Sequence, residues 1–246
     1  MKEFIYDGTF EGLLTAIFYA FSCKQECTIK KNINYTPSLL AENVDVITEE
    51  DKYDRVYTSI ERKLNSDTLE NIYTLYLSEY KDSEDLIVEY LKLCFTYGIK
   101  VNLAKNNDII MKVDKYNQRV SYEAHRFKGF VRFKEIGALT YYASIDPDHN
   151  ILPLLINHFS ARFSDQNFII HDIKREIAIF YDKKEATIID FSKEDGLKLE
   201  NLKVDSDFEK LWKTFYNSVN IEERKNEKLR RQHMPKRYWS HLTEVK

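Results

Sequence analysis

The chain has 246 residues, of which 43% are hydrophobic, and its formal net charge is −3 at pH 7. This composition predicts a soluble protein with a sizeable core, organised as one large domain or two small ones, and no run of 18 apolar residues predicts a membrane-spanning helix. Six glycines and the absence of GxGxxG and GxxxxGK[ST] exclude the common glycine-rich nucleotide-binding loops.

The first residues and the cysteines bear on the compartment. MKEFIYDGTFEG lacks the apolar run of a secretory signal, so we expect a cytoplasmic protein without a membrane partner. Cys23, Cys27 and Cys94 suit free thiols in a reducing compartment. A radical-SAM cluster would need a further cysteine at position 30, where Lys30 stands, and we expect neither a metal nor another cofactor.

The first half of the chain is predicted to be mainly helical. A short strand at the start leads into a turn, and Thr9 is placed to open a helix whose apolar residues share one face. VDVIT (44–48) has the pattern of a short strand, and helical periodicity continues from there to about residue 126. Ser83 is a suitable start for one of these helices, and Gly98 is a suitable stop.

The pattern changes after residue 126. FKGFVRFKE (127–135) and ALTYYASI (138–145) alternate, which predicts a hairpin with its turn at Ile136-Gly137. Asp146 and Pro147 are then expected to open a helix. Three further short strands are expected in NFIIHDI, EIAIFYD and ATIIDF.

Two more helices are expected near the end of the chain. DFEKLWKTFYNSV (207–219) has a helical pattern, and Asn220 is placed to open a last helix that Pro235 ends. The predicted fold class is therefore α+β, with a helical N-terminal half followed by an antiparallel sheet of about five strands flanked by helices. The expected domains are 1–126 and 127–246, unless the two form one continuous domain.

The most basic segment is ERKNEKLRRQHMPKRYW (223–239). From Arg224 to Arg237 it holds seven Lys or Arg and one Glu, although the whole chain is acidic. Cations at helical spacing, followed by two aromatic residues, are typical of contacts with phosphates and unstacked bases. The alternative is a solvated charge run whose last two rings anchor the tail. The candidate residues are Arg224, Lys225, Lys228, Arg230, Arg231, Lys236, Arg237, Tyr238 and Trp239.

A second candidate for nucleic-acid contact lies in FKGFVRFKE. If this segment is a strand, Lys128, Phe130 and Arg132 share one face, and a basic row interrupted by a ring is an arrangement that single-stranded nucleic acid uses. The alternative is a solvated sheet face with one aromatic residue covered by a helix.

The histidines suggest a different function. His125, His158 and His171 each lie within four residues of an arginine, and Asp172 follows His171. If these segments converge, they could carry out general acid–base chemistry on a phosphate or a base. The alternative is that the histidines are ordinary core or surface residues. The catalytic candidates are His125, His158, His171, Asp172 and Arg175.

A third hypothesis rests on residues 42–89, which hold 14 Asp or Glu against five Lys or Arg, a net charge of −9. An acidic helical surface of this kind could dock a partner protein, and the chain would then be a protein–protein adaptor.

Four segments resemble a bacterial family of unknown activity labelled "probable DNA metabolism protein". They are YDGTFEGLLTAIF (6–18), EAHRFKGFVRFKE (123–135), IIHDIKR (169–175) and IEERKNEKLRRQHMPKRYWSHLTE (221–244). The resemblance implies a context of DNA repair or modification and an association with a radical-SAM protein. In some bacteria the domain is fused to a uracil-DNA glycosylase module, whose motifs this chain lacks. The resemblance carries over no catalytic residues.

Taken together, these observations favour a DNA-binding accessory factor in DNA repair or modification that acts with a radical-SAM partner. The two alternatives are an enzyme that acts on nucleic acid or a modified base through the His/Asp/Arg cluster, and the adaptor.

Overall fold

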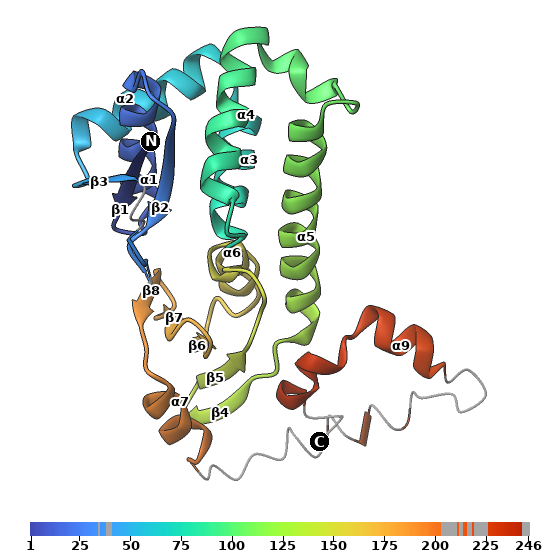
Figure 1. Ribbon diagram of the computed structural model, residues 1–246. Coiled ribbons are helices and arrows are strands. Elements are labelled where there is room, and N and C mark those ends of the chain that lie inside the picture. Colours follow the sequence, from blue (N-terminus) through green and yellow to red (C-terminus); the bar gives the residue numbers. More distant parts are fainter. Residues whose placement is uncertain are drawn as a thin grey trace. The chain divides into compact units, whose positions relative to one another are not determined.

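The computed structural model shows a mixed α/β protein (Figure 1). It describes residues 1–33, 35–37, 41–202 and 226–242, together with residues 211, 214, 215 and 218. The chain divides into two compact units, Met1–Ser121 and Tyr122–Lys246, and the boundary falls within one long helix.

The first unit contains a small parallel sheet. Its strands β1 (Lys2–Tyr6), β2 (Cys27–Lys31) and β3 (Glu42–Asp45) lie in the order β2-β1-β3. The strand expected at the start is confirmed, and the second expected strand lies slightly earlier than VDVIT. β2 was not predicted, since its sequence CTIKK is short and carries two lysines.

Several helices of the first unit precede the long helix that crosses its boundary. They are α1 (Phe10–Ser22), α2 (Glu50–Lys63), α3 (Ser66–Leu77), α4 (Ser83–Tyr97) and the 3-10 helix η1 (Ile99–Leu103). The predicted start of α1 is confirmed, because the Thr9 hydroxyl accepts a hydrogen bond from the Gly12 backbone N–H at 2.9 Å. The predicted stop of α4 is also confirmed, because Gly98 adopts φ +73°, a conformation that glycine tolerates best.

The long helix α5 (Asp108–Phe130) corrects the prediction of a strand at residues 127–135. Val120, Ala124 and Phe127 are buried and recur at helical spacing, so the helix continues its apolar face through the first part of that segment. Only the end of the segment is extended, in β4 (Lys134–Gly137). Lys128 and Phe130 are therefore helical, and Arg132 lies in the connection that follows the helix.

The second unit is built on a five-stranded sheet with the order β4-β5-β6-β7-β8. After β4, its strands are β5 (Thr140–Ile145), β6 (Asn167–Asp172), β7 (Ile177–Tyr181) and β8 (Ala186–Asp190). The predicted hairpin, the three later strands and the α+β fold class are confirmed. The turn of the hairpin lies at Ala138-Leu139, since Ile136 and Gly137, where it was expected, belong to β4. The sheet is mixed rather than wholly antiparallel: β5 and β6 pair in parallel, because α6 (Leu152–Arg162) connects them.

The start of α6 differs from the prediction. Asp146 and Pro147 lie in a loop, and the helix begins at Leu152. The carbonyl oxygens of Pro147 and Asp148 accept hydrogen bonds from the Arg175 guanidinium at 3.2 and 2.7 Å. These carbonyls are therefore committed to a side chain instead of to a helical turn.

Side chains of the sheet alternate between two faces. Phe168 packs against Phe159 and Phe163 of the α6 segment, with ring centroids 6.4 and 6.2 Å apart. The opposite face is covered by α7 (Lys193–Glu200), where Tyr142, Ile169 and Ala178 form a small core with Leu199 against it.

The C-terminal part of the chain contains the helix α9 (Glu227–His233) and the 3-10 helix η3 (Lys236–His241). Of the helix expected at 207–219, the structure describes only Leu211, Thr214, Phe215 and Ser218, which are helical, and the helix start expected at Asn220 lies outside the described residues. The predicted end before Pro235 is confirmed. Among the described helices, none combines the length and the hydrophobicity that crossing a bilayer requires.

Candidate nucleic-acid interface

The C-terminal basic segment begins with α9. The Asn226 side chain accepts a hydrogen bond from the Leu229 backbone N–H at 3.0 Å, which caps the helix. Pro235 separates α9 from η3. Arg224 and Lys225, the first two candidates of this segment, lie outside the described residues.

Tyr238 attaches this segment to the C-terminal part of α5. Its side chain is 2% exposed, and its ring packs against Phe127 and Phe130 with centroids 4.8 and 6.0 Å apart. The Tyr238 hydroxyl donates a 2.5 Å hydrogen bond to the buried Glu123 carboxylate. Burial raises the pKa of Tyr238, and the neighbouring Glu123 charge raises it further. In this conformation Tyr238 acts as an anchor and its ring is not accessible to a base.

Glu123 holds three partners at once. Besides the Tyr238 hydroxyl, its carboxylate accepts the backbone N–H groups of Asp148 and His149 at 2.9 and 2.8 Å. Arg237 completes the network: it donates to the Tyr238 hydroxyl at 2.7 Å and pairs with the Asp148 carboxylate at 2.5 Å. The candidate Arg237 is therefore already engaged, although half of its side chain is exposed.

Trp239 is flanked by cations. Its indole N–H donates to the Met234 carbonyl at 3.0 Å, which fixes the ring across the α9–η3 junction. The Arg230 guanidinium lies 4.8 Å and the Lys236 ammonium 5.8 Å from the ring centroid. Trp239 is half-buried, so part of its surface stays exposed near two positive charges.

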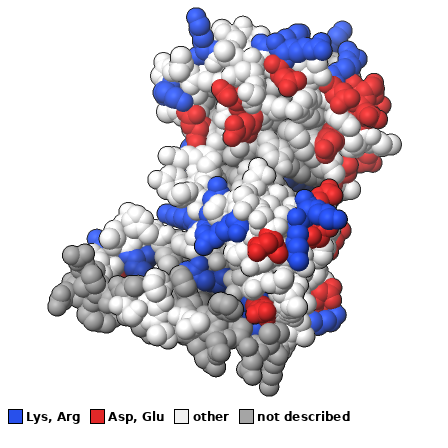
Figure 2. Space-filling view, turned by 180° about the vertical axis from the view of Figure 1, so that it is seen from behind, with Lys and Arg blue, Asp and Glu red and all other residues white. Residues whose placement is uncertain are grey.

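The remaining cations of the segment are exposed. Lys228, Arg231 and Lys236 make no ion pair with any residue that the structure describes, whereas Arg230 pairs with Glu227 at 3.3 Å. On the face of the molecule seen in Figure 2, Lys and Arg side chains form several separate clusters with Asp and Glu between them. Positive charge is therefore local to particular segments.

The second candidate surface does not form the predicted row. Because Lys128 and Phe130 belong to α5, their side chains do not alternate with Arg132 along a strand. Phe130 packs toward Tyr238, and Arg132 donates to the Gly129 carbonyl at 2.6 Å. A contact of these three residues with nucleic acid stays a prediction, but the strand geometry proposed for it is wrong.

The histidines do not converge. His158 lies on α6, on the face of the sheet that Phe168 also faces, whereas His171 lies on β6 and faces α7. His125 is exposed on α5. His158 and His171 therefore lie on opposite faces of the sheet, so the convergence on which the catalytic hypothesis depended is not seen for this pair.

His171 has a structural environment instead. It is fully buried, and its Nδ1 lies 2.8 Å from the Tyr142 hydroxyl. A Cβ added to Gly196 of α7 would lie 2.5 Å from that Nδ1, so the backbone of α7 packs directly against the His171 ring. Burial lowers the pKa of His171, which keeps the imidazole neutral, while the Phe191 backbone and the Glu200 charge act in the opposite direction.

Asp172 and Arg175 close the turn between β6 and β7. The buried Asp172 carboxylate accepts the Arg175 guanidinium at 2.7 Å and the backbone N–H groups of Lys174 and Arg175 at 3.1 and 3.2 Å. Burial raises the pKa of Asp172, and the contacts with Arg175 oppose that effect. The Asp172 carboxylate is held by a guanidinium and two backbone N–H groups, which is the pattern of a structural ion pair.

Sequence reasoning missed Glu123 as the centre of this site. Its signal is a charged residue on the apolar face of α5, beside Ala124 and between Val120 and Phe127. A carboxylate at such a position needs hydrogen-bond partners. The pattern does not tell which distant residues supply them.

Residues 81–244 match the family model of the domain of unknown function DUF4130. No curated protein matches the chain.

Proposed function

The chain belongs to the DUF4130 family, a domain of unknown function, and we propose that this member is a DNA-binding accessory factor in DNA repair or modification. The proposed contact is the C-terminal segment 226–242. Three exposed cations on this segment (Lys228, Arg231 and Lys236) provide charge for phosphates.

The observation that carries this proposal is that two cationic side chains lie near the Trp239 ring. Its ring is held in place by the hydrogen bond to the Met234 carbonyl and lies near the side chains of Arg230 and Lys236. A ring beside two cations offers a base a surface for stacking and its phosphates a positive charge, which is how single strands are bound without sequence preference.

The proposed role is to hold DNA for a partner enzyme. The resemblance of the chain to the "probable DNA metabolism protein" family suggests a radical-SAM protein as that partner. This assignment would explain why the chain has exposed cations on a firmly anchored segment but no converging set of catalytic side chains among the candidates.

The experiment measures binding of a short fluorescein-labelled DNA, single- or double-stranded, by anisotropy over about 50 to about 200 mM salt. We expect affinity to fall steeply with salt. The triple substitution Lys228→Gln, Arg231→Gln and Lys236→Gln should weaken binding by about tenfold or more and flatten the salt dependence.

A matched control removes three exposed lysines elsewhere in the second unit, Lys183, Lys184 and Lys193. This control should bind as the unmodified protein does. Trp239→Ala should weaken binding to single strands by about 1 to 3 kcal/mol. Unchanged binding by the C-terminal triple variant would overturn the proposal.

A further inference from the structure

A second basic surface lies in the first unit, within the acidic part of the chain. A shallow hollow on α2 is lined by one run of that helix. We call its polar and cationic residues the α2 cationic face: Arg55, Thr58, Ser59, Arg62 and Lys63. Residues 42–89 contain only five Lys or Arg, so three of the five gather here.

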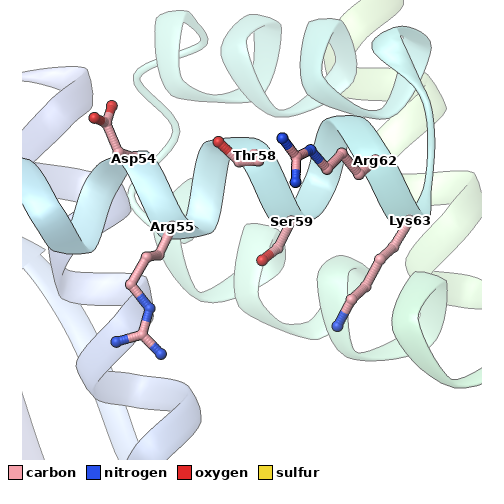
Figure 3. A pocket seen from close by; sticks show the side chains of 6 residues that line it. All are labelled: Asp54, Arg55, Thr58, Ser59, Arg62 and Lys63. Atoms are coloured by element: carbon pink, nitrogen blue, oxygen red, sulfur yellow. The ribbon is translucent and has the colours of Figure 1, made fainter.

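The spacing of these residues explains why they share a surface. Arg55, Ser59 and Arg62 follow one another at intervals of four and three, which places them along one side of a helix. Figure 3 shows Arg55, Ser59 and Lys63 extending to the same side of α2, with the Arg62 side chain directed back toward Thr58 and Ser59.

Most of the negative charges of α2 lie on another side of the helix. Glu50, Asp54 and Glu61 recur at intervals of four and seven, on a different side from Arg55 and Arg62, and of these three only Asp54 borders the hollow. Asp51 lies four residues before Arg55, on the side of the cations, but it does not line the hollow. The three cations therefore outnumber the acidic residue on their own side of α2.

The three cations of this face are available to bind a ligand. All three are exposed, and none forms an ion pair with any part of the chain that the structure describes. Arg55 makes one contact, with its guanidinium 5.0 Å from the Phe18 ring centroid, which orients the group without neutralising it. The hydroxyls of Thr58 and Ser59 are half-buried between the cations and add hydrogen-bond donors.

A purely structural explanation covers only part of this arrangement. Arg62 and Lys63 lie in the last turn of α2, where positive charge stabilises the helix dipole. That effect does not extend to Arg55, two turns earlier, nor does it require the hydroxyls and the hollow between them.

We infer that the α2 cationic face is a second contact surface for the sugar-phosphate backbone of DNA. Guanidinium groups and hydroxyls are the groups that proteins use for phosphate oxygens. An anionic membrane is a weaker fit, because membrane-binding helices insert their apolar face into the lipid, whereas the apolar residues Tyr53, Val56 and Ile60 of α2 pack into the protein core. This inference rests on the proposed function, since it assumes that the chain binds DNA.

The test uses the full chain and the anisotropy assay described above. The variant Arg55→Gln, Arg62→Gln and Lys63→Gln keeps helix-favouring side chains and removes three charges. We expect its affinity for duplex DNA to fall by about tenfold or more, and its salt slope to fall by about 1 for each phosphate that it no longer neutralises. The matched control neutralises three exposed lysines elsewhere in the first unit, Lys92, Lys100 and Lys115. We expect this control to have the affinity and the salt slope of the unmodified protein.

The outcomes separate the two proposals. If the α2 variant binds like its control while the C-terminal variant loses affinity, the inference fails and the proposed function stands. If the unmodified protein binds no DNA, both fail. If the α2 variant, its lysine control and the C-terminal variant lose affinity equally, binding responds to net charge alone and the α2 assignment is overturned. If the α2 variant loses binding only to vesicles of anionic lipid, the surface contacts membranes and the inference is again wrong.

Discussion

The Tyr238 hydroxyl donates a hydrogen bond to the Glu123 carboxylate across 115 positions of sequence, and both side chains are buried. This bond joins the long helix α5 to the C-terminal segment. Because Glu123 also accepts two backbone N–H groups from residues 148 and 149, three separate stretches of chain meet at one carboxylate.

The first prediction concerns this hydrogen bond. Tyr238→Phe should lower the free energy of unfolding by about 1.5 to 3 kcal/mol, because the substitution removes a hydrogen bond to a charged, buried acceptor. Urea denaturation measures the change, and limited proteolysis should show faster cleavage near the C-terminus. Tyr122→Phe is the matched control, since that side chain is 58% exposed. Equal protease resistance of both variants would show that Tyr238 is not the anchor.

A second prediction concerns the packing of α7 against His171. Gly196→Ala should destabilise the protein by about 1 to 3 kcal/mol, because the new methyl group meets the His171 ring and the Tyr142 hydroxyl at 2.5 and 2.8 Å. Gly129→Ala is the control: nothing lies within 4 Å of the added carbon, and alanine favours the helix. Thermal unfolding should therefore move in opposite directions in the two variants, and a shared direction would contradict the packing of α7.

A third prediction concerns pH. Burial lowers the pKa of His171 below its ordinary value of 6.5, so the unfolded chain binds a proton more readily than the folded protein. The stability that the neutral ring contributes is present above pH 6.5 and is lost as the pH falls below it. Its slope is at most about 1.4 kcal/mol per pH unit.

Unfolding midpoints between about pH 8 and about pH 5 measure this effect. His158, whose pKa burial also lowers, adds a loss of the same sign. His171→Gln should show a shallower decline than the unmodified protein, whatever its absolute stability. His125→Gln, at an exposed position, should keep the original profile. A decline of the same steepness in His171→Gln would remove His171 as a cause.

The fourth prediction separates a structural from a catalytic role for Asp172. Arg175→Met should cost about 3 to 5 kcal/mol of unfolding free energy, because it leaves a buried carboxylate without its partner. Adding Asp172→Asn to that variant should restore part of the loss. Lys193→Met is the control, since the Lys193–Glu176 pair is about half exposed and its removal should change stability by less than about 1 kcal/mol. No recovery in the double variant would contradict the ion-pair assignment.

Local signals in the sequence were reliable where short-range chemistry decides the structure. Thr9 caps α1 and Gly98 ends α4 because each acts on neighbouring backbone groups. The strands β6 to β8 were predictable because each is a short run of apolar residues between polar turns.

The segment 127–133 shows where local patterns become ambiguous. Phe127 and Val131 fit both the alternation of a strand and the four-residue interval of a helix. The structure follows the second pattern, because Val120 and Ala124 have already established an apolar face that Phe127 continues. Packing of the Phe127 ring against Tyr238 further stabilises the helical conformation of this segment.

The candidate site was predictable in composition but not in geometry. The charges and rings of the C-terminal segment are visible in the sequence, whereas the division between anchor and accessible ring depends on Glu123, which lies more than a hundred residues away. In the same way, the separation of His158 from His171 depends on strand register, which no pattern within either segment reveals.

The burial of Tyr238 also has a consequence for the energetics of ligand capture. A loose basic tail loses conformational entropy when it settles on a polyanion, and that loss weakens the complex. Here the backbone of residues 236–242 is ordered when the protein folds, with Tyr238 and Leu242 inserted into the interior. Lys236 and Trp239 therefore meet a ligand with less freedom left to lose, and each interaction contributes more of its gross strength to affinity.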